Sequence, residues 1–463
     1  MPIRRLFCKR ERPAQFVTRR NGYRAYTVSM TDDALHATTR FGLGPRLNEP
    51  LPGDARGWLL GQLDGADPTL ATPGPSTADG LTAWHLDRKT PVPEGTPPRV
   101  HELWQAERAA IGTAMVTARA PFRERLVWFW ANHFTISSRQ GEINAVAGAY
   151  IREAIRPNVT ARFADLLIAV MTHPAMLLYL DNGGSIGPDS RAALATRPGQ
   201  PRRGLNENLA RECLELHTVS PAAGYTQADV TAAAGVLTGW AIEIDGAAPG
   251  FVFRPDAHQP GEIRVLGQTF PAGMQGGLAM LTWLGTHPAT YAHIAKKLVT
   301  HFAGDLPPAD AVARVNRVLT ATRGDLRAAS AELVAIPTCW TGEKMRPPQE
   351  YLVAAARAVD LPADQHLALV NAMGAIGQPL LGAPLPNGFS DRAEDWNSGE
   401  ALLRRVDWAW SLAGRLPDVE PGAVFDTVLG PAGHPELRRV VKGAGSRREG
   451  LALLLSSPPM MRR

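Results

Sequence analysis

The segment GLNENLARECLELHTVSPAAGYTQADVTAAAGVLTGW (Gly204–Trp240) contains the densest set of proton-transferring side chains in the chain. Its polar residues are Glu207, Asn208, Arg211, Glu212, Glu215 and His217. Asn206 is a residue type that caps helices, so we expect a helix over residues 206–217. Thr226 and Asp229 have the spacing of a capping box, which predicts a second helix up to the end of the segment.

The polar side chains of the first helix are typical of acid–base chemistry. Glu207, Arg211 and Glu215 share one line of the helix at 100° per residue, and Asn208 and Glu212 lie beside it. Neighbouring carboxylates raise one another's pKa and the Arg211 guanidinium lowers it, which leaves one acid and one base. The predicted catalytic residues are Glu207, Arg211, Glu212, Glu215 and His217, with Asn208 as a substrate contact. The alternative is structural, because the same spacing gives an ion-pair ladder or side chains that hold neighbouring loops.

The rest of the chain has mainly helical periodicity, interrupted by stretches rich in Gly and Pro. We predict a mainly α fold, with one large multi-helix domain over residues 31–463. A small antiparallel β-hairpin is expected as an insertion at residues 251–270. Loop excursions are expected near residues 64–98 and 183–204, and the second is either a lid or a plain insertion.

Further candidate ligands lie outside the dense helix. Asp181 and Asn182 follow an apolar run, where a polar pair can line a cleft, and Arg254 and Asp256 lie at the tip of the expected hairpin. These four residues are predicted substrate contacts. The predicted ligands of a divalent metal are His133, in a helix that is apolar almost all round, and His258, at the hairpin tip. For His133 the alternative is a hydrogen-bonded core residue.

A third pair of histidines lies on one predicted helix face. His293, Lys297 and His301 are spaced i, i+4 and i+8. The two histidines could bind a metal, but Lys297 between them opposes a cation, so a solvated or hydrogen-bonded face is favoured. The chain has no H-E-x-x-H, G-x-S-x-G, P-loop or G-x-G-x-x-G motif.

Charge and cysteine content narrow the function classes. The chain carries a formal net charge of +5, but its first thirty residues hold eight Lys/Arg and one Glu. The body is therefore close to neutral, which is a poor match for a phosphate backbone, and nucleic-acid binding is not expected. The three cysteines lack metal or disulfide spacing, as is typical of a reducing compartment.

The basic segment over residues 1–30 is expected to be a disordered tail, with Met30 as an alternative start. It lacks the apolar run of about 7–15 residues that a secretory signal needs. No stretch has the roughly 18 apolar residues of a membrane span. The sequence therefore favours a cytoplasmic location, with an exported location as the alternative.

Several segments together resemble the domain-of-unknown-function 1800 family of bacterial proteins. The resemblance begins with NEN-x-x-RE-x-x-ELHT, GYT-x-x-DV and LTGW within Gly204–Trp240. It extends to these further segments: ATTRFGLGP at Ala37–Pro45, RLVWFWANHFTIS at Arg125–Ser137, MTHPAMLLYLDN at Met171–Asn182, FVFRPDAHQPGEIRVLG at Phe251–Gly267, KKLVTHF at Lys296–Phe302 and PNGFSDRAEDW at Pro386–Trp396. It thus spans residues 31–455, which is nearly the whole chain.

The resemblance implies a mainly helical protein but no settled activity. Members often accompany a second family that resembles sulfatases and alkaline phosphatases. Two functional hypotheses follow. One is a hydrolase that uses the Glu/Arg/His cluster of residues 206–217, with a divalent metal as an option. The other is a non-catalytic binding or accessory protein that acts with a phosphatase-like or sulfatase-like partner.

Overall fold

The structure is a computed structural model that describes residues 30–90, 92–195, 204–430 and 433–463. It is 61% helical, and its only described strands form two small two-stranded sheets. The predicted mainly α class is therefore confirmed. The tail over residues 1–29 and part of the expected loop at 183–204 lie outside the described residues.

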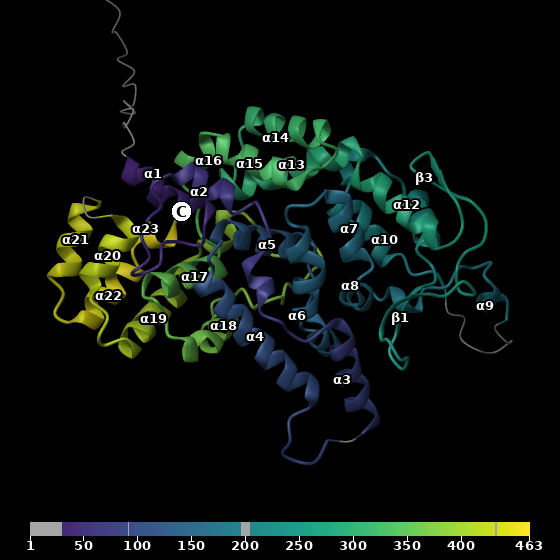
Figure 1. Ribbon diagram of the computed structural model, residues 1–463, viewed down its shortest axis with the longest axis horizontal. Coiled ribbons are helices and arrows are strands. Elements are labelled where there is room, and N and C mark those ends of the chain that lie inside the picture. The colour runs from purple at the N-terminus through teal and green to yellow at the C-terminus, as the bar shows by residue number, and fades with distance from the viewer. Residues whose placement is uncertain (1–29, 91, 196–203, 431–432) are drawn as a thin grey trace, which may run out of the picture.

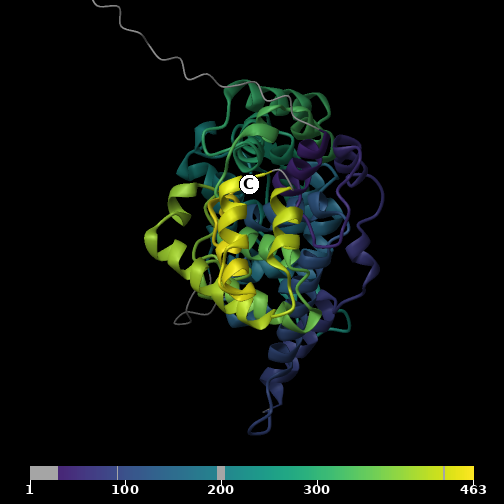
Figure 2. The same cartoon turned by 90° about the vertical axis from the view of Figure 1, so that its left-hand side faces the viewer.

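The first two-fifths of the chain builds most of the centre of the molecule and a projecting helical pair. Its helices are α1 Met30–His36, α2 Ala55–Gly61, α3 Thr77–Lys89, α4 Arg99–Thr117, α5 Pro121–His133, α6 Ala147–Ala149, α7 Phe163–Met171, α8 Pro174–Tyr179 and α9 Arg191–Leu194. In both ribbon views α3, α4 and their connecting loop project from the body (Figures 1 and 2). Helix α5 is buried along most of its length, as its aromatic pattern predicts.

The middle of the chain forms one end and one edge of the molecule (Figure 1). Its helices are α10 Asn208–Glu212, α11 Gln227–Val236, α12 Met274–Gly285, α13 Pro288–Phe302, α14 Ala309–Ala321, α15 Leu326–Ala335 and α16 Thr338–Thr341. Thr226 and Asp229 form the expected capping box at the start of α11, each side chain bonded to the other residue's backbone N–H.

The C-terminal helices are α17 Pro348–Ala358, α18 His366–Ala375, α19 Gly399–Arg415, α20 Pro421–Leu429, α21 Pro435–Lys442, α22 Arg447–Leu455 and α23 Pro458–Met461. Of these helices, α19 to α22 gather at the opposite end, whereas α17 and α18 lie against α4 (Figures 1 and 2). A single cluster of buried hydrophobic residues extends from Ala37 to Met461. No described helix is long and apolar enough to cross a membrane.

The expected hairpin over residues 251–270 is wrong in its pairing. Strand β2 (Gly250–Phe253) pairs with β1 (Trp240–Glu243), and β3 (Ile263–Val265) pairs with β4 (Gln268–Phe270). Leu266 and Gly267 both have positive φ, 48° and 83°, and form the two-residue turn that favours the second hairpin. Residues 254–262 therefore connect two hairpins and do not form a hairpin tip.

Three helical segments contain a π-helical turn, in which the hydrogen bonds span five residues. These turns are Ala37–Phe41, Tyr150–Ile155 and Cys213–His217. Each π turn changes which side chains share a face, so helical spacing predicted from 3.6 residues per turn fails beyond it. Such turns are frequent at functional sites. The turns Ala37–Phe41 and Cys213–His217 carry residues of the candidate sites described below.

Candidate active site

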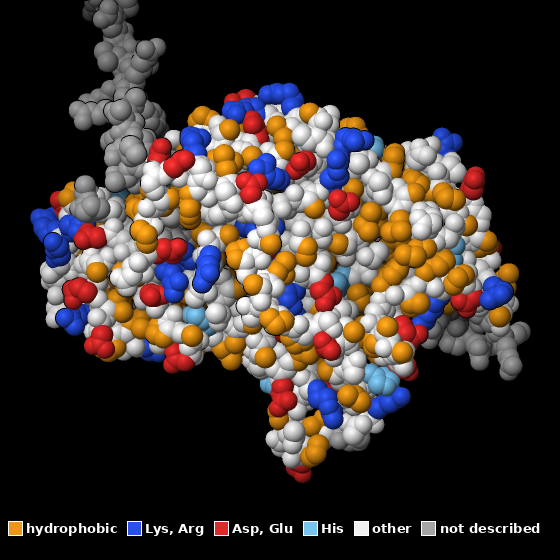
Figure 3. Space-filling model, in the orientation of Figure 1, with side chains coloured by type: hydrophobic (Ala, Val, Ile, Leu, Met, Phe, Trp, Pro, Cys, Tyr) orange, Lys and Arg blue, Asp and Glu red, His pale blue; other side chains and the backbone are white. Residues whose placement is uncertain are grey.

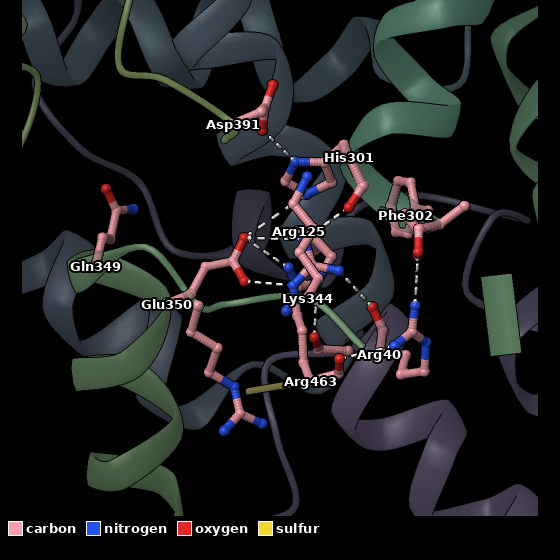
Figure 4. A network of polar contacts seen from close by, with 12 residues as sticks. Arg40, Arg125, His301, Phe302, Lys344, Gln349, Glu350, Asp391 and Arg463 are labelled. Atoms are coloured by element: carbon pink, nitrogen blue, oxygen red, sulfur yellow. Dashed lines mark hydrogen bonds and ion pairs between the residues drawn. The ribbon is translucent and has the colours of Figure 1, made fainter. Parts of the chain in front are cut away.

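The C-terminal end of α13 is capped by buried cations from distant parts of the chain. Lys344 Nζ donates to the Thr300 carbonyl over 2.6 Å, and Arg463 donates to the His301 carbonyl over 2.7 Å. Arg40, in the first π turn, donates to the carbonyls of residues 302 and 303 (Figure 4). The last four carbonyls of a helix lack partners within it and carry partial negative charge, so cations stabilise them. This capping holds His301 at a defined place.

Glu350 is the carboxylate that lies against Arg125 and Arg463. It lies in the first turn of α17, where the helix dipole favours negative charge. Arg125 Nη1 lies 2.8 Å from Oε1 and Arg463 Nε lies 2.7 Å from Oε2, and Arg463 Nη2 donates a longer hydrogen bond of 3.5 Å to Oε1. The positive charges of Arg125 and Arg463 hold the pKa of Glu350 well below its usual range despite burial. Glu350 is therefore a carboxylate at neutral pH.

His301 and Asp391 form a hydrogen-bonded pair beside Glu350. Asp391 Oδ1 lies 3.0 Å from His301 Nδ1, and the other ring nitrogen, Nε2, lies 3.8 Å from Glu350 Oε1 and has no hydrogen bond (Figure 4). Burial lowers the pKa of His301 to about 4. The pKa of Asp391 falls to about 2 because its hydrogen bond to His301 and nearby positive charges outweigh burial. His301 is thus neutral, with its proton on Nδ1.

The loop that carries Asp391 is fastened to α5. Asn132 donates from its amide to the Phe389 carbonyl and accepts from the Phe389 N–H, both over 2.8 Å. Gly388 has a φ of +74°, and a Cβ there would lie 2.4 Å from the Asn132 carbonyl oxygen. Only glycine allows this close approach. The loop therefore presents Asp391 to His301 at a defined position.

These residues line one pocket between α5, α13, α17 and the loop at Phe389–Asp391. Its polar lining residues are Arg125, Asn132, Thr135, His301, Gln349, Glu350, Gln378, Ser390 and Asp391. Its apolar lining residues include Leu43, Met115, Trp128, Phe129, Leu381 and Phe389. An apolar pocket with a few convergent polar groups of perturbed pKa is the expected form of an active site.

A histidine cluster lies further along the same face of α13. The ring of His133 lies 5.6 Å from that of His217 and 6.1 Å from that of His293, measured between centroids. His133 Nε2 contacts the His217 carbonyl and His293 Nε2 contacts the Leu216 carbonyl. Burial, with the charge of Lys297 second, lowers the pKa of His217 to about 3 and that of His293 to about 4. The fold thus brings together the predicted residues His133 and His217.

The predicted ion-pair ladder on the dense helix is only half formed. Arg211 pairs with Glu207 over 2.9 Å, and Glu207 also accepts hydrogen bonds from Gln227 and Thr231. Glu215 instead accepts from Tyr225 over 3.3 Å. The reason is the π turn Cys213–His217, which rotates Glu215 off the line. The first part of the helix, α10, thus carries a surface network.

The pKa values of the carboxylates on this helix separate, as predicted. Hydrogen bonds from Thr231 and Gln227, with smaller help from Arg211, lower the pKa of Glu207. Burial, and then the charge of Glu215, raises the pKa of Glu212. The charge of Glu212 and burial raise the pKa of Tyr179 to about 12, with burial as the larger cause.

The predicted substrate contacts Asn208, Asp181 and Asn182 have local structural partners. Asn208 is exposed, and its backbone N–H donates to Asn206. The Asp181 carbonyl accepts from the Asn206 amide over 2.7 Å. Asn182 is buried and donates to the carbonyls of Leu237 and Trp240. The pair thus joins α8 to β1, and nothing places it in the pocket beside His301.

Arg254, Asp256 and His258 also hold loops in place. Arg254 is exposed and contacts the Ile242 carbonyl, and the Asp256 carbonyl accepts from the backbone at Ala192. His258 uses both ring nitrogens, Nδ1 toward the Thr238 carbonyl at 2.9 Å and Nε2 as acceptor from Gly273 N–H at 2.7 Å. No ring nitrogen of His258 is left for a metal. Within the described ranges, no group of three or more His, Cys, Asp or Glu residues is arranged to hold one.

The sequence predictions did not select Arg125, Glu350, Asp391 or Arg463, and they left His301 as a hydrogen-bonded or solvated residue. These residues come from segments far apart in the chain and share no local spacing. One signal was present. Three of the segments that resemble a known family, at Arg125–Ser137, Lys296–Phe302 and Pro386–Trp396, contain Arg125, His301 and Asp391.

Comparison with known proteins agrees with that resemblance. No curated protein and no solved structure matches the chain. The family model described as "Protein of unknown function (DUF1800)" matches residues 36–462. This match covers nearly all of the described structure, including the pocket and the histidine cluster. The chain therefore belongs to the DUF1800 family of proteins of unknown function.

Proposed function

We propose that this protein is a hydrolase whose general base is His301, oriented by Asp391. The observation that carries the proposal is a pair of unprotonated acceptors, His301 Nε2 and Glu350 Oε1, 3.8 Å apart at the pocket. Two acceptors at this separation cannot bond to each other. A water molecule about 2.8 Å from both can donate one proton to each.

Such a water is positioned as a nucleophile. Its oxygen attacks the electrophilic centre of an ester while one proton passes to His301 Nε2, and His301 then returns that proton to the leaving-group oxygen. Asp391 fixes the tautomer and stabilises the imidazolium that forms in between. Trp128, Phe129 and Phe389 supply an apolar wall for the leaving group.

This proposal places hydrolysis at the pocket and not on the helix over residues 206–217. The carboxylates of that helix are partly exposed, and those of Glu207 and Glu215 are bonded to neighbouring side chains. His301, Asp391 and Glu350 instead converge on one space. Of the five catalytic residues predicted from the sequence, only His217 is buried near α13.

The test is hydrolysis of 4-nitrophenyl phosphate, sulfate and acetate by the wild type and by His301→Asn, Asp391→Asn and His101→Asn. We expect turnover of one ester class to fall at least 100-fold in the first two variants. It should persist in the control, because His101 is exposed and distant from the pocket. Since His301 must be neutral, activity should fall only near its pKa of about 4. Turnover that is equal in all variants would refute the assignment.

A second candidate function, binding of a phosphatase-like or sulfatase-like partner, is favoured by one observation. Helix α19 exposes Leu403, Val406 and Trp410, spaced i, i+3 and i+7 on one face, at 64%, 40% and 46% of their surface. Capture of such a partner by the wild type but not by Leu403→Glu would support this role. Unchanged ester hydrolysis in that variant would show that the two functions are separate.

A further inference from the structure

Lys297 is a partly buried cation for which the described residues provide no direct partner. It lies on α13 one turn before His301, so the two side chains share a face and their Cα atoms are about 6 Å apart. No hydrogen bond joins its ammonium to another described residue, and no described carboxylate lies within ion-pair distance. Asp391 is the carboxylate close enough to raise its pKa, against the larger lowering by burial.

The buried cations nearby, Arg125, Arg463, Lys344 and Arg40, have direct partners. Arg125 and Arg463 pair with Glu350, and Lys344 lies 3.3 Å from Asp305. Arg40 donates hydrogen bonds to backbone carbonyls, including that of Cys339 over 2.7 Å. Lys297 therefore differs from these cations in having no direct hydrogen-bond or ion-pair partner among the described residues, and only Asp391 acts on its charge from a longer distance. A partly buried charge without a direct partner is unfavourable unless a ligand of opposite charge binds.

Two buried ring nitrogens of the histidine cluster near Lys297 lack hydrogen-bond partners among the described residues. His133 Nδ1 and His217 Nδ1 are buried with no partner. Because His133 Nε2 donates to the His217 carbonyl, its Nδ1 carries a lone pair and needs a donor. Repulsion by the Lys297 ammonium disfavours a metal cation at this place and favours an anion. Lys297 and His293 are partly exposed, which leaves the cluster open to solvent at that side.

We propose that Lys297, with His133 and His217, binds the phosphate group of a phosphate monoester substrate. Lys297 needs an acceptor of negative charge, and His133 Nδ1 needs a donor. A phosphate that keeps one proton supplies both, because its charged oxygens accept from Lys297 and its hydroxyl donates to His133 Nδ1. Sulfate at neutral pH has the charge but no proton, so it satisfies only the first. That the bound phosphate group belongs to a substrate rests on the proposed function. That the site binds phosphate does not.

The test is thermal unfolding in sodium phosphate, sodium sulfate or sodium chloride at equal ionic strength and pH 7. The proteins are the wild type, Lys297→Met and Lys296→Met. Lys296 is the matched control, since it has the same charge and the adjacent position but is exposed. For the wild type and Lys296→Met we expect a saturable rise in Tm of about 2 °C or more with phosphate, and a smaller one with sulfate.

Lys297→Met should lose the rise in Tm with phosphate. In chloride it should be at least as stable as the wild type, because the partly buried charge of Lys297, which has no direct partner among the described residues, is removed. A phosphate effect that persists in Lys297→Met, or that is absent from the wild type, would overturn the inference. Equal effects of sulfate and phosphate would overturn the role of His133. If the protein binds phosphate but hydrolyses no ester, the proposed function alone is wrong. If the protein hydrolyses an ester, does not bind phosphate, and keeps its turnover in Lys297→Met, this inference alone is wrong.

Discussion

At the scale of single residues, burial and paired charge decide the protonation states in this protein. His301 and His217 are neutral because burial lowers their pKa, to about 4 and about 3. Glu350 remains a carboxylate despite burial because the positive charges of Arg125 and Arg463 stabilise it. The chemistry proposed for the pocket depends on the states of His301 and Glu350.

Arg463 should matter much more to stability than its neighbour Arg462. The side chain of Arg463 is 0% exposed and lies against Glu350, so Arg463→Ala should lower the free energy of unfolding by about 3 kcal/mol or more. Arg462 is 56% exposed and pairs with Glu343, so Arg462→Ala should cost less than about 1 kcal/mol. Urea unfolding measures both losses. Equal losses would show that Glu350 does not depend on Arg463.

At the scale of elements, the pocket depends on the end of one helix and on one loop. The C-terminal end of α13 places His301, and the loop fastened by Asn132 places Asp391. Neither element makes the site alone, because the hydrogen bond between His301 and Asp391 joins residues ninety positions apart. The loop has a specific weakness at Gly388.

Gly388→Ala should be more destabilising than Gly377→Ala. Both glycines have positive φ, +74° and +102°, and share a backbone strain of about 1–3 kcal/mol on substitution. A Cβ at Gly388 would also clash with the Asn132 carbonyl, whereas nothing lies within 4 Å of one at Gly377. The difference in unfolding free energy therefore measures the clash, and ester hydrolysis should fall only in Gly388→Ala. Matching losses would mean that the loop moves freely away from α5.

At the scale of the whole molecule, the buried histidines tie stability to pH. His133, His217, His293 and His301 all have pKa values lowered by burial in the folded state. Between pH 6.5 and about 4 the unfolded chain therefore binds more protons at these positions than the folded chain does. Stability must rise with pH through this window and fall as the solution is acidified.

We expect the free energy of unfolding to drop by several kcal/mol between pH 6.5 and pH 4, since each tenfold lowering of a proton affinity contributes about 1.4 kcal/mol. Urea unfolding at pH 7.5, 6, 5 and 4 measures the slope. His301→Asn should reduce that slope, and His101→Asn should leave it unchanged because His101 is exposed. A flat profile from pH 7 to pH 4 would contradict the burial of these rings.

Much of the local structure could be predicted from the sequence because short-range physics sets it. The helical periodicity predicts the mainly α class, and the aromatic pattern of α5 predicts its burial. The capping box at Thr226 and the ion pair between Glu207 and Arg211 depend on residues three or four positions apart. All of these features are decided within one or two helical turns.

The tertiary structure decided what depends on distant contacts. The hairpin pairing was wrong because β1 begins close after α11, and the ladder failed because a π turn rotates Glu215. The pocket was not found because Arg125, His301, Glu350, Asp391 and Arg463 meet only when α5, α13 and α17 pack together. Sequence alone determined which helices form, whereas packing determined which charges are buried together, and that burial sets the chemistry.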